Sequence, residues 1–384
     1  MAPMKRYDTI IAGGGLIGAS IAFELARAGL HVALFDAQQP GREASWASAG
    51  IISPAPENPS TIPLLPLSRA SAALYPVFVK TLQEITGREV GYRPYGTLEA
   101  LLTGDVREEL STLIAVHHGL GLKAEALSAA EARKLEPSLS EHTEAAILRP
   151  DEASVDNRAL TQAALDAAKH QGAEIHAGNA AKALWQDGSR CKGLTLTNGN
   201  VEAPWTIIAA GCFSSTIAGC ERYAPVFPAK GQMVSLRSDA VPIKRTLWSK
   251  NIYLVPRNDG RILAGATTEH VGFDQHVTPG GLKKIFAAAI ELVPALESAH
   301  VEETWAGLRP DSPDHLPILG PTDMEGLLFA TGHFRSGVLL APLTARLIRD
   351  WITTRSLSVD WERFSPMRFL EAPKAYSASS HEHD

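Results

Sequence analysis

The chain begins with an apolar strand that leads directly into spaced glycines, and this pattern constrains the fold more than any other. Residues 7–12 read YDTIIA, and Gly13, Gly15 and Gly18 follow in the spacing GxGxxG. Gly13 permits a tight turn, Gly15 lets the backbone approach a pyrophosphate, and Gly18 lets the next helix pack against the strand. A second apolar stretch at 31–36 ends on an acid. This order predicts one half of a dinucleotide-binding domain.

The first helix and the acid after the second strand indicate which dinucleotide binds. A helix expected over residues 17–28 would aim its N-terminal N–H groups and the positive end of its dipole at the phosphates. Asp36 lies where an acid hydrogen-bonds a ribose hydroxyl and repels the 2′-phosphate of NADP, so FAD or NAD is favoured. Leu16, Ile17 and Ala37 flank these groups and are expected to line the same site.

The composition describes a globular chain with ordinary cores. At 384 residues, 45% of them apolar, the sequence is long enough for two to three domains. The net charge is −6 and the basic residues are scattered rather than clustered, so we expect no nucleic-acid partner. The apolar stretch 338–351 contains Arg346, Arg349 and Asp350 and is too short to cross a bilayer, so we expect no membrane span.

The cysteines and the first residues of the chain indicate the cellular compartment. Cys191, Cys212 and Cys220 have neither CxxC nor metal-ligand spacing, and such an odd, sparse set suits a reducing cytosol. The start lacks a signal-peptide pattern, because glycines interrupt its apolar stretch and Glu24 and Arg27 follow. We therefore expect a cytoplasmic protein with inert thiols and no metal site.

The strands that could complete the first half-site come only after long interruptions. Short, buried, parallel-type strands are expected at 173–176, 205–211 and 326–330. The other expected elements are a loop at 41–59, helices at 67–86, 106–120, 156–171 and 338–353, and strands at 244–254 and 261–268 paired across the turn at 258–260. Since a second domain has to be inserted between the parallel strands, the arrangement is typical of FAD-binding folds and favours FAD over NAD.

Further strings of residues add to the glycine fingerprint. They are ASWASAG at 44–50, PAKG at 228–231, YLVPR at 253–257 leading to GAT at 265–267, WAGLRP at 305–310 and GHFRSG at 332–337. On these strings the chain resembles the D-amino-acid oxidase family of FAD-dependent oxidoreductases, and most closely the glycine oxidases of the thiamine-biosynthetic type. The resemblance covers almost everything up to about residue 370.

The resemblance implies an α/β fold with two domains. One is a FAD-binding Rossmann-like domain of the glutathione-reductase type, and the other is an inserted α+β substrate domain on a mainly antiparallel sheet. We expect the FAD-binding domain to comprise residues 1–60, 140–225 and 315–370, and the substrate-binding domain residues 61–139 and 226–314. The polar tail at 371–384 is expected to be disordered.

The resemblance also implies the reaction. It is oxidative deamination of glycine, sarcosine or a small D-amino acid, by hydride transfer from Cα to flavin N5, with oxygen reduced to hydrogen peroxide. Relatives with covalent flavin carry a cysteine in the region that corresponds to 311–320, where this chain has none, so FAD is expected to be noncovalent. Two alternative functions are a dehydrogenase that passes electrons to a quinone or carrier and a non-catalytic flavin-binding protein. The sequence also allows a homo-oligomer.

Three side chains are candidates for binding the substrate. To aim the substrate Cα–H at the flavin, an enzyme has to hold the carboxylate, and a guanidinium does so bidentately. Arg309 matches the carboxylate-binding arginine of the family, and Tyr253 matches the substrate tyrosine, whose O–H can donate to the same carboxylate. Arg335 matches an arginine close to substrate and flavin. The alternatives are a surface arginine, a packing tyrosine and an arginine whose ion pair braces the turn, respectively.

Two segments are expected to lie along the flavin. Small residues in the loop after the first half-site permit close backbone approach. The turn at 332–337 leads into the last helix, whose N-terminus, with Pro342 near its first turn, would stabilise negative charge on the reduced flavin. His333 is expected to pack rather than to act as a base. The expected contacts from these and other segments are Ala44, Ser45, Ala49, Gly50, Ile51, Ala181, Gly211, Gly332, His333, Phe334, Arg335, Ser336, Gly337, Val338 and Leu339.

Three positions depart from the family pattern or shape the substrate cavity. Asn251 stands where glycine oxidases carry histidine, and Ser53 and Thr268 occupy places beside the substrate. They predict a pocket more polar than glycine alone would need.

Overall fold

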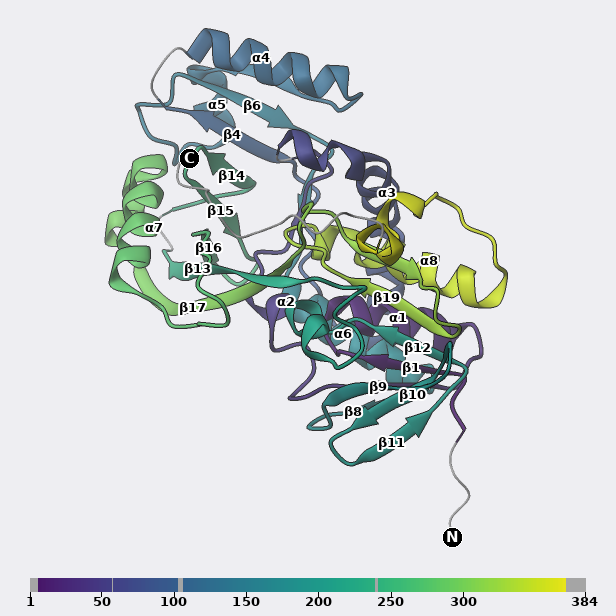
Figure 1. Ribbon diagram of the computed structural model, residues 1–384. Helices are drawn as coiled ribbons and strands as arrows, with labels where there is room; N and C mark the ends of the chain where they lie inside the picture. The colour runs from purple at the N-terminus through teal and green to yellow at the C-terminus, as the bar shows by residue number, and fades with distance from the viewer. Residues whose placement is uncertain (1–5, 57, 103–105, 239–240, 371–384) are drawn as a thin grey trace.

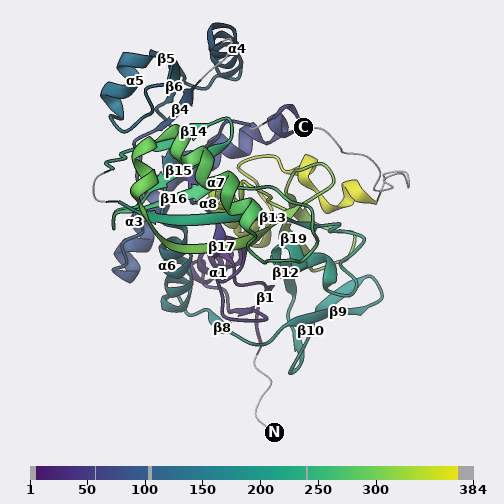
Figure 2. The same cartoon turned by 90° about the vertical axis from the view of Figure 1, so that its left-hand side faces the viewer.

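Two large sheets organise the chain and occupy different parts of the molecule (Figures 1 and 2). The computed structural model describes residues 6–56, 58–102, 106–238 and 241–370. The tail at 371–384, predicted to be disordered, lies outside the described residues.

The six-stranded sheet is built on the strand–glycine–helix–strand unit at the start of the chain. Its order is β18-β19-β12-β1-β2-β8, in which β18 is antiparallel to β19 and all other neighbours are parallel. Its strands are β1 (Thr9–Ala12), β2 (Val32–Phe35), β8 (Glu174–His176), β12 (Trp205–Ile208), β18 (Ile318–Pro321) and β19 (Leu327–Thr331). The late strands expected at 173–176, 205–211 and 326–330 are therefore confirmed as the neighbours that complete the sheet.

Both faces of this sheet are covered, and for that reason its central strands are apolar throughout rather than alternating. Ile11 and Leu34 pack against helices, while Ile10 and Phe35 pack against a small three-stranded sheet. The helices are α1 (Leu16–Arg27), α3 (Leu65–Thr86), α6 (Asn157–His170) and α8 (Gly337–Thr353). The small sheet consists of β9 (Ala181–Asp187), β10 (Arg190–Leu196) and β11 (Gly199–Glu202).

Helix α6 begins and ends where the sequence predicts. The Asp156 carboxylate accepts hydrogen bonds from the N–H groups of Arg158 and Ala159, both at 3.0 Å, and so caps the helix. After the helix, Gly172 has a φ of 95°, which a residue with a side chain rarely adopts.

The eight-stranded sheet has the order β17-β13-β16-β15-β14-β4-β6-β5. Its neighbours are antiparallel except for β14 and β4, which are parallel, so the prediction of a mainly antiparallel second sheet is confirmed. Its strands are β4 (Thr97–Leu101), β5 (Glu125–Ser128), β6 (Ala145–Arg149), β13 (Phe227–Arg237), β14 (Thr246–Ser249), β15 (Ile252–Pro256), β16 (Arg261–Gly265) and β17 (His300–Asp311). Its helices are α4 (Val106–Gly119), α5 (Ala129–Leu135) and α7 (Pro279–Leu292), seen at its outer side in Figure 1.

The structure corrects several expectations. The stretch 244–254 is two strands, β14 and β15, rather than one. The expected loop at 41–59 contains α2 (Ala44–Ala47) and β3 (Ile51–Ile52), and β3 pairs with β7 (Ala153–Ser154). Short 3₁₀ helices, none of them predicted, lie at Pro59–Leu64, Gly211–Thr216, Pro294–Ser298, Glu362–Phe364 and Pro366–Phe369.

The division into domains stays a prediction. The pairing of one strand, β6, concerns the predicted boundary at residue 140. Strand β6 pairs with β4 and β5 of the eight-stranded sheet, although it falls in the segment 140–225 that we assigned to FAD binding. The expected fold class, a parallel FAD-type sheet with an inserted, mainly antiparallel sheet, is confirmed wherever this boundary is drawn.

Pro342 lies inside α8 rather than in its first turn, which corrects a further expectation. A proline has no N–H, so the carbonyl of Val338, four residues earlier, loses its helical donor. The hydroxyl of Tyr75, on α3, donates to this carbonyl instead. One turn away, the Ser71 hydroxyl donates to the Leu339 carbonyl at 2.6 Å and accepts from the Leu343 N–H at 3.3 Å. Two hydroxyls of α3 thus complete the backbone hydrogen bonding of α8.

One helical stretch of the described residues, Pro59–Thr86, is long and apolar enough to cross a membrane by length and composition alone. It lies outside the stretch 338–351 on which the expectation of no membrane span rested. Within it, Leu67, Tyr75 and Leu82 are buried in the core that α3 forms with α6 and α8. Core packing therefore accounts for much of its apolar character.

We expect Tyr75→Phe to destabilise the protein by about 1–3 kcal/mol, because it leaves the buried Val338 carbonyl without a donor. Urea unfolding of the holoprotein, followed by circular dichroism, measures the shift. Tyr95→Phe is the matched control, since the Tyr95 ring is 46% exposed. Equal unfolding midpoints for Tyr75→Phe and the wild type would show that the hydroxyl does not complete the helix.

Candidate active site

A large cavity of about 1070 Å³ brings together residues from both sheets. The glycine-rich turn and α1 line one part of it, and strands β13 to β17 line another. Of the residues predicted at the site, Gly18, Thr268 and Gly332 do not line the cavity. Those that do are Gly13, Gly15, Leu16, Ile17, Asp36, Ala37, Ala44, Ser45, Ala49, Gly50, Ile51, Ala181, Gly211, Tyr253, Arg309, His333, Phe334, Arg335, Ser336, Gly337, Val338 and Leu339.

The glycine fingerprint is packed too tightly for side chains. A Cβ on Gly13 would lie 2.4 Å from the carbonyl oxygen of Ala209, and its φ is 107°. A Cβ on Gly18 would lie 2.0 Å from the carbonyl oxygen of Gly13. Gly18 therefore lets α1 pack against the turn, and it has this role without touching the cavity.

The polar groups beside the fingerprint are fixed by hydrogen bonds. The Asp36 carboxylate accepts from the N–H of Gly14 at 2.7 Å and from the N–H of Gln38 at 2.8 Å. The Ser45 hydroxyl accepts from the N–H of Leu16, in the first turn of α1, at 2.8 Å. The acid at the end of β2 and the start of α1 therefore face the cavity in defined positions.

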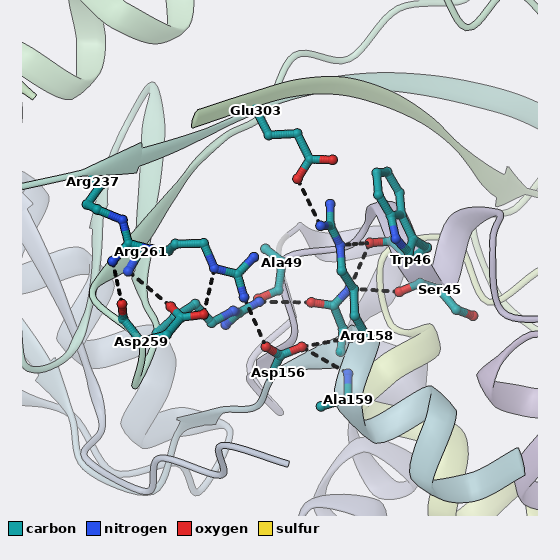
Figure 3. Close-up of polar contacts among 12 residues, drawn as sticks. Ser45, Trp46, Ala49, Asp156, Arg158, Ala159, Arg237, Asp259, Arg261 and Glu303 are labelled. Carbon is teal, nitrogen blue, oxygen red and sulfur yellow. Dashed lines mark hydrogen bonds and ion pairs between the residues drawn. The ribbon is translucent and has the colours of Figure 1, made fainter. Parts of the chain in front are cut away.

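The segment 44–50 is held by donors from distant parts of the chain (Figure 3). The Asn157 amide donates to the carbonyls of Ser45 and Trp46 at 2.8 and 3.0 Å. The buried Arg257 guanidinium donates to the carbonyl of Ala49 at 2.9 Å and to the Asn157 side-chain oxygen at 2.8 Å. These contacts fix a backbone that lines the cavity.

Trp305 and Arg158 also contact the segment 44–50. The Trp305 indole N–H donates to the carbonyl of Ala47 at 2.9 Å. The Arg158 guanidinium lies 3.6 Å from the ring centre of Trp46 and pairs with Glu303 at 2.9 Å, as Figure 3 shows. No role was predicted for the residues that make these contacts. Trp305 and Arg257 stand inside the quoted strings, but only the fold reveals what they donate to.

Arg309 lies on β17, over a glycine of the neighbouring strand β13. A Cβ on Gly231 would lie 2.3 Å from its Nη1, so the guanidinium rests against the Gly231 backbone. Nη1 also donates to the carbonyl of Thr267 at 3.2 Å. Gly231 was missed as a site residue, although PAKG was one of the matching strings.

Tyr253 lies next to Arg309 along the same face of the sheet. Its hydroxyl donates to the Met233 sulfur at 3.3 Å. Gly231 and Met233 are two residues apart on β13 and so point to the same face, about 7 Å from each other. Both also line the cavity, as do Arg309 and Tyr253. The structure therefore brings the two predicted substrate residues together.

Arg335 and its turn adjoin the same site. Its Nη2 donates to the Thr268 hydroxyl at 3.0 Å. Phe334 has a φ of 47°, and its N–H donates to the carbonyl of Pro310, the residue after Arg309, at 2.8 Å. The first residues of α8 line the cavity beyond this turn, so the helix N-terminus faces it.

The cavity continues past Tyr253 to a polar end. Trp248 stands opposite Tyr253, and Glu99 stands opposite Trp248 in the sheet register. Glu99 pairs with Arg149, and all of these residues line the cavity. Ser53 and Asn251 line it too, whereas Thr268 lies outside the lining and contacts it through Arg335. The expected polarity of the substrate pocket stays a prediction.

The three thiols are free and buried. Burial raises the pKa of Cys212, which lines the cavity, to about 12. Burial also raises the pKa of Cys191 and of Cys220. The cytoplasmic location inferred from their number and spacing stays a prediction.

His333 is buried, and its Nε2 lies 3.2 Å from the Thr344 hydroxyl. Burial lowers the pKa of His333 from 6.5 to about 3, so the ring is neutral at neutral pH. This environment suits the packing role expected of it.

The depressed pKa of His333 predicts a pH-dependent stability. Because the unfolded chain binds this proton near pH 6.5 and the folded chain only near pH 3, stability is complete above pH 6.5 and falls as the pH is lowered. We expect this group to remove about 2 kcal/mol from the free energy of unfolding between pH 6.5 and 5.

Urea unfolding at a series of pH values checks this expectation. His333→Gln should flatten the pH dependence, while His142→Gln, at an exposed position, should leave it unchanged. A slope that His333→Gln does not alter would contradict the assignment.

Comparison with known proteins gives consistent matches. The family described as FAD dependent oxidoreductase matches residues 8–351. The bifunctional protein ThiO/ThiG of a Synechocystis species is 36% identical over 370 residues, which cover 94% of this chain and 54% of that protein. This chain therefore spans about half the length of that relative and of two others with the same name.

A single-function relative matches end to end. Glycine oxidase of Geobacillus kaustophilus is 34% identical over 369 residues, which cover 95% of this chain and 98% of that enzyme. A crystal structure of glycine oxidase from the same organism superposes with a TM-score of 0.89 at 33% identity, covering 94% and 99% of the two chains.

Proposed function

The chain belongs to the DAO family of FAD-dependent oxidoreductases, and we propose that it oxidises glycine, sarcosine or a small D-amino acid with oxygen as the electron acceptor. Its glycine oxidase and ThiO relatives support an enzyme of the same type. The observation that carries the substrate class is the Arg309 guanidinium resting on Gly231, beside Tyr253, in the cavity wall.

The residues at the first-strand end of the cavity fit FAD. The glycine turn lets a pyrophosphate approach the start of α1, where the Ser45 hydroxyl already accepts from the N–H of Leu16 and can also contact a phosphate. The fixed Asp36 carboxylate can accept from ribose hydroxyls. When bound, FAD takes up the hydrogen and the two electrons that leave the substrate Cα. We propose noncovalent binding, since no cysteine occurs at 311–320.

The substrate side of the cavity can hold an amino acid by its carboxylate. The Arg309 guanidinium offers a planar fork of donors, and the Tyr253 hydroxyl offers a further donor on the same face. Together they would fix how the Cα–H bond is aimed. Burial lowers the pKa of His333 to about 3 and makes it a weak base, and its Nε2 contacts the Thr344 hydroxyl, so water is the acceptor that we propose for the ammonium proton.

The first experiment tests cofactor and acceptor. We expect purified protein to be yellow, to release intact FAD on heating or acid, and to bleach when mixed anaerobically with glycine, sarcosine or a small D-amino acid. Admitting air should restore the colour promptly and produce hydrogen peroxide. Reduced protein that survives air for many minutes but reoxidises with a quinone analogue would point to a dehydrogenase, and flavin retained by the denatured chain would contradict noncovalent binding.

The second experiment tests the carboxylate contact. Arg309→Ala should lower kcat/KM for the best amino acid by roughly 30-fold to several thousand-fold, since losing a charge-assisted bidentate pair costs about 2–5 kcal/mol. Arg309→Lys should recover part of this loss, because an ammonium has charge without the fork. The decarboxylated amine should be a poor substrate whose oxidation the mutation hardly alters.

Arg346→Ala is the control for this series, since Arg346 is exposed on α8. If Arg309→Ala keeps its FAD and oxidises the amino acid within a few-fold of the wild type, the carboxylate is held elsewhere.

A further inference from the structure

The two arginines in the cavity wall donate to neighbouring residues of one segment. Arg309 donates to the carbonyl of Thr267, and Arg335 donates to the hydroxyl of Thr268. This segment, residues 266–278, joins β16 to α7. The position of this segment therefore affects the position of both guanidinium groups, although Arg309 and Arg335 themselves lie on other parts of the chain.

A buried lysine holds the segment from the opposite face of β13. Lys230 is 1% exposed, and its Nζ lies 2.8 Å from Asp274 and 3.3 Å from Glu269. The backbones of Lys230 and Glu269 also exchange two hydrogen bonds of 2.9 Å. Burial disfavours a charged lysine, yet the hydrogen bonds to Asp274 and Glu269 raise the pKa of Lys230 above its ordinary value.

Gln232 extends this anchor along the strand. Its backbone N–H donates to the Thr267 hydroxyl at 2.9 Å, and its side-chain amide donates to Glu269 at 2.8 Å. The amide oxygen accepts from the N–H of Thr278 at 2.8 Å, and the Thr267 hydroxyl donates to Glu269 at 2.5 Å. Both ends of the segment are thereby tied to β13.

The alternation of β13 connects this anchor to the substrate side. Side chains of successive strand residues point to opposite faces, so Lys230 and Gln232 face away from Gly231 and Met233. One face of the strand supports Arg309 and Tyr253, and the other holds the segment to which Arg309 and Arg335 donate.

A buried charge is weak support for stability as such, because Lys230 loses its hydration even though the carboxylates of Glu269 and Asp274 stay partly exposed. A hydrophobic residue of similar length would fill the volume at less cost, whereas a charged pair with several hydrogen bonds fixes one geometry. The location of this pair directly behind the carboxylate site suits such a geometric role.

We propose that Lys230, acting through Glu269, is a positioning residue that sets where Thr267 and Thr268 hold the two cavity arginines for the substrate carboxylate. The inference rests on the proposed function. It assigns carboxylate affinity to a lysine that touches neither substrate nor FAD.

The test uses FAD-loaded Lys230→Met and acetate as the carboxylate probe. We expect the Kd of acetate, read from the change in flavin absorbance, to rise about 10- to 100-fold, and KM for glycine to rise more than kcat falls. Oxidation of methylamine, which has no carboxylate, should change less than about threefold. The control is Lys192→Met, whose pair with Asp187 at 2.9 Å lies at the surface on β9 and β10.

Two further variants keep the proposal testable if Lys230→Met folds poorly. Glu269→Gln preserves the shape but removes the charge, and it should weaken acetate binding in the same direction. In an Arg309→Ala background, Lys230→Met or Glu269→Gln should cause a smaller additional loss than in the wild type, because one of the two arginines through which the anchor acts is already absent. A general structural defect would lower glycine and methylamine oxidation alike and would persist in the Arg309→Ala background.

The outcomes separate the two proposals. Wild-type protein that neither binds acetate nor oxidises any amino acid would overturn the proposed function. Wild-type protein that does both, together with Lys230→Met and Glu269→Gln variants of unchanged acetate affinity, would overturn the positioning role alone. Equal losses for glycine and methylamine would overturn it as well.

Discussion

The arrangement of the cavity depends on how the carbonyl groups of segment 44–50 are satisfied. This backbone lies between the two sheets, where its carbonyls are partly or wholly shielded from water. Buried carbonyls need donors, and here the donors are Asn157, Arg257 and Trp305. Because Asn157 starts α6 while Arg257 and Trp305 belong to the eight-stranded sheet and its connections, the same contacts join the FAD side to the substrate side.

Local patterns explain what the sequence predicted well. The central parallel strands were identified because they are short, almost wholly apolar and followed by glycine, and a sheet covered on both faces favours that composition. The limits of α6 were identified because a cap at Asp156 and a left-handed Gly172 are signals within a few residues of each helix end. The first half-site is likewise a local pattern.

Long-range contacts explain what was missed. Asn157 and Ser45 are 112 residues apart, and nothing near either shows that the amide of one binds the carbonyl of the other. Pro342 was expected near the first turn of α8, where a missing N–H costs little. It lies in the helix interior instead, where Tyr75, 263 residues from Val338, supplies the hydrogen-bond donor that the Val338 carbonyl would otherwise lack. Arg309 and Tyr253 were predicted from family strings, whereas Gly231, against which the Arg309 guanidinium rests, has no side chain that could mark it in the sequence.

The parallel pairing of β14 with β4 divides the eight-stranded sheet into two parts of different origin in the chain. Strands β4, β5 and β6 come from residues 97–149, and the other five come from residues 227–311. Only three residue pairs, Thr246–Trp248 with Thr97–Glu99, form the seam between them. Glu99 and Arg149 lie on one side of this seam and Arg309 and Tyr253 on the other. Substitutions in residues 97–149 can therefore reshape the outer end of the cavity without altering the strands that carry Arg309 and Tyr253.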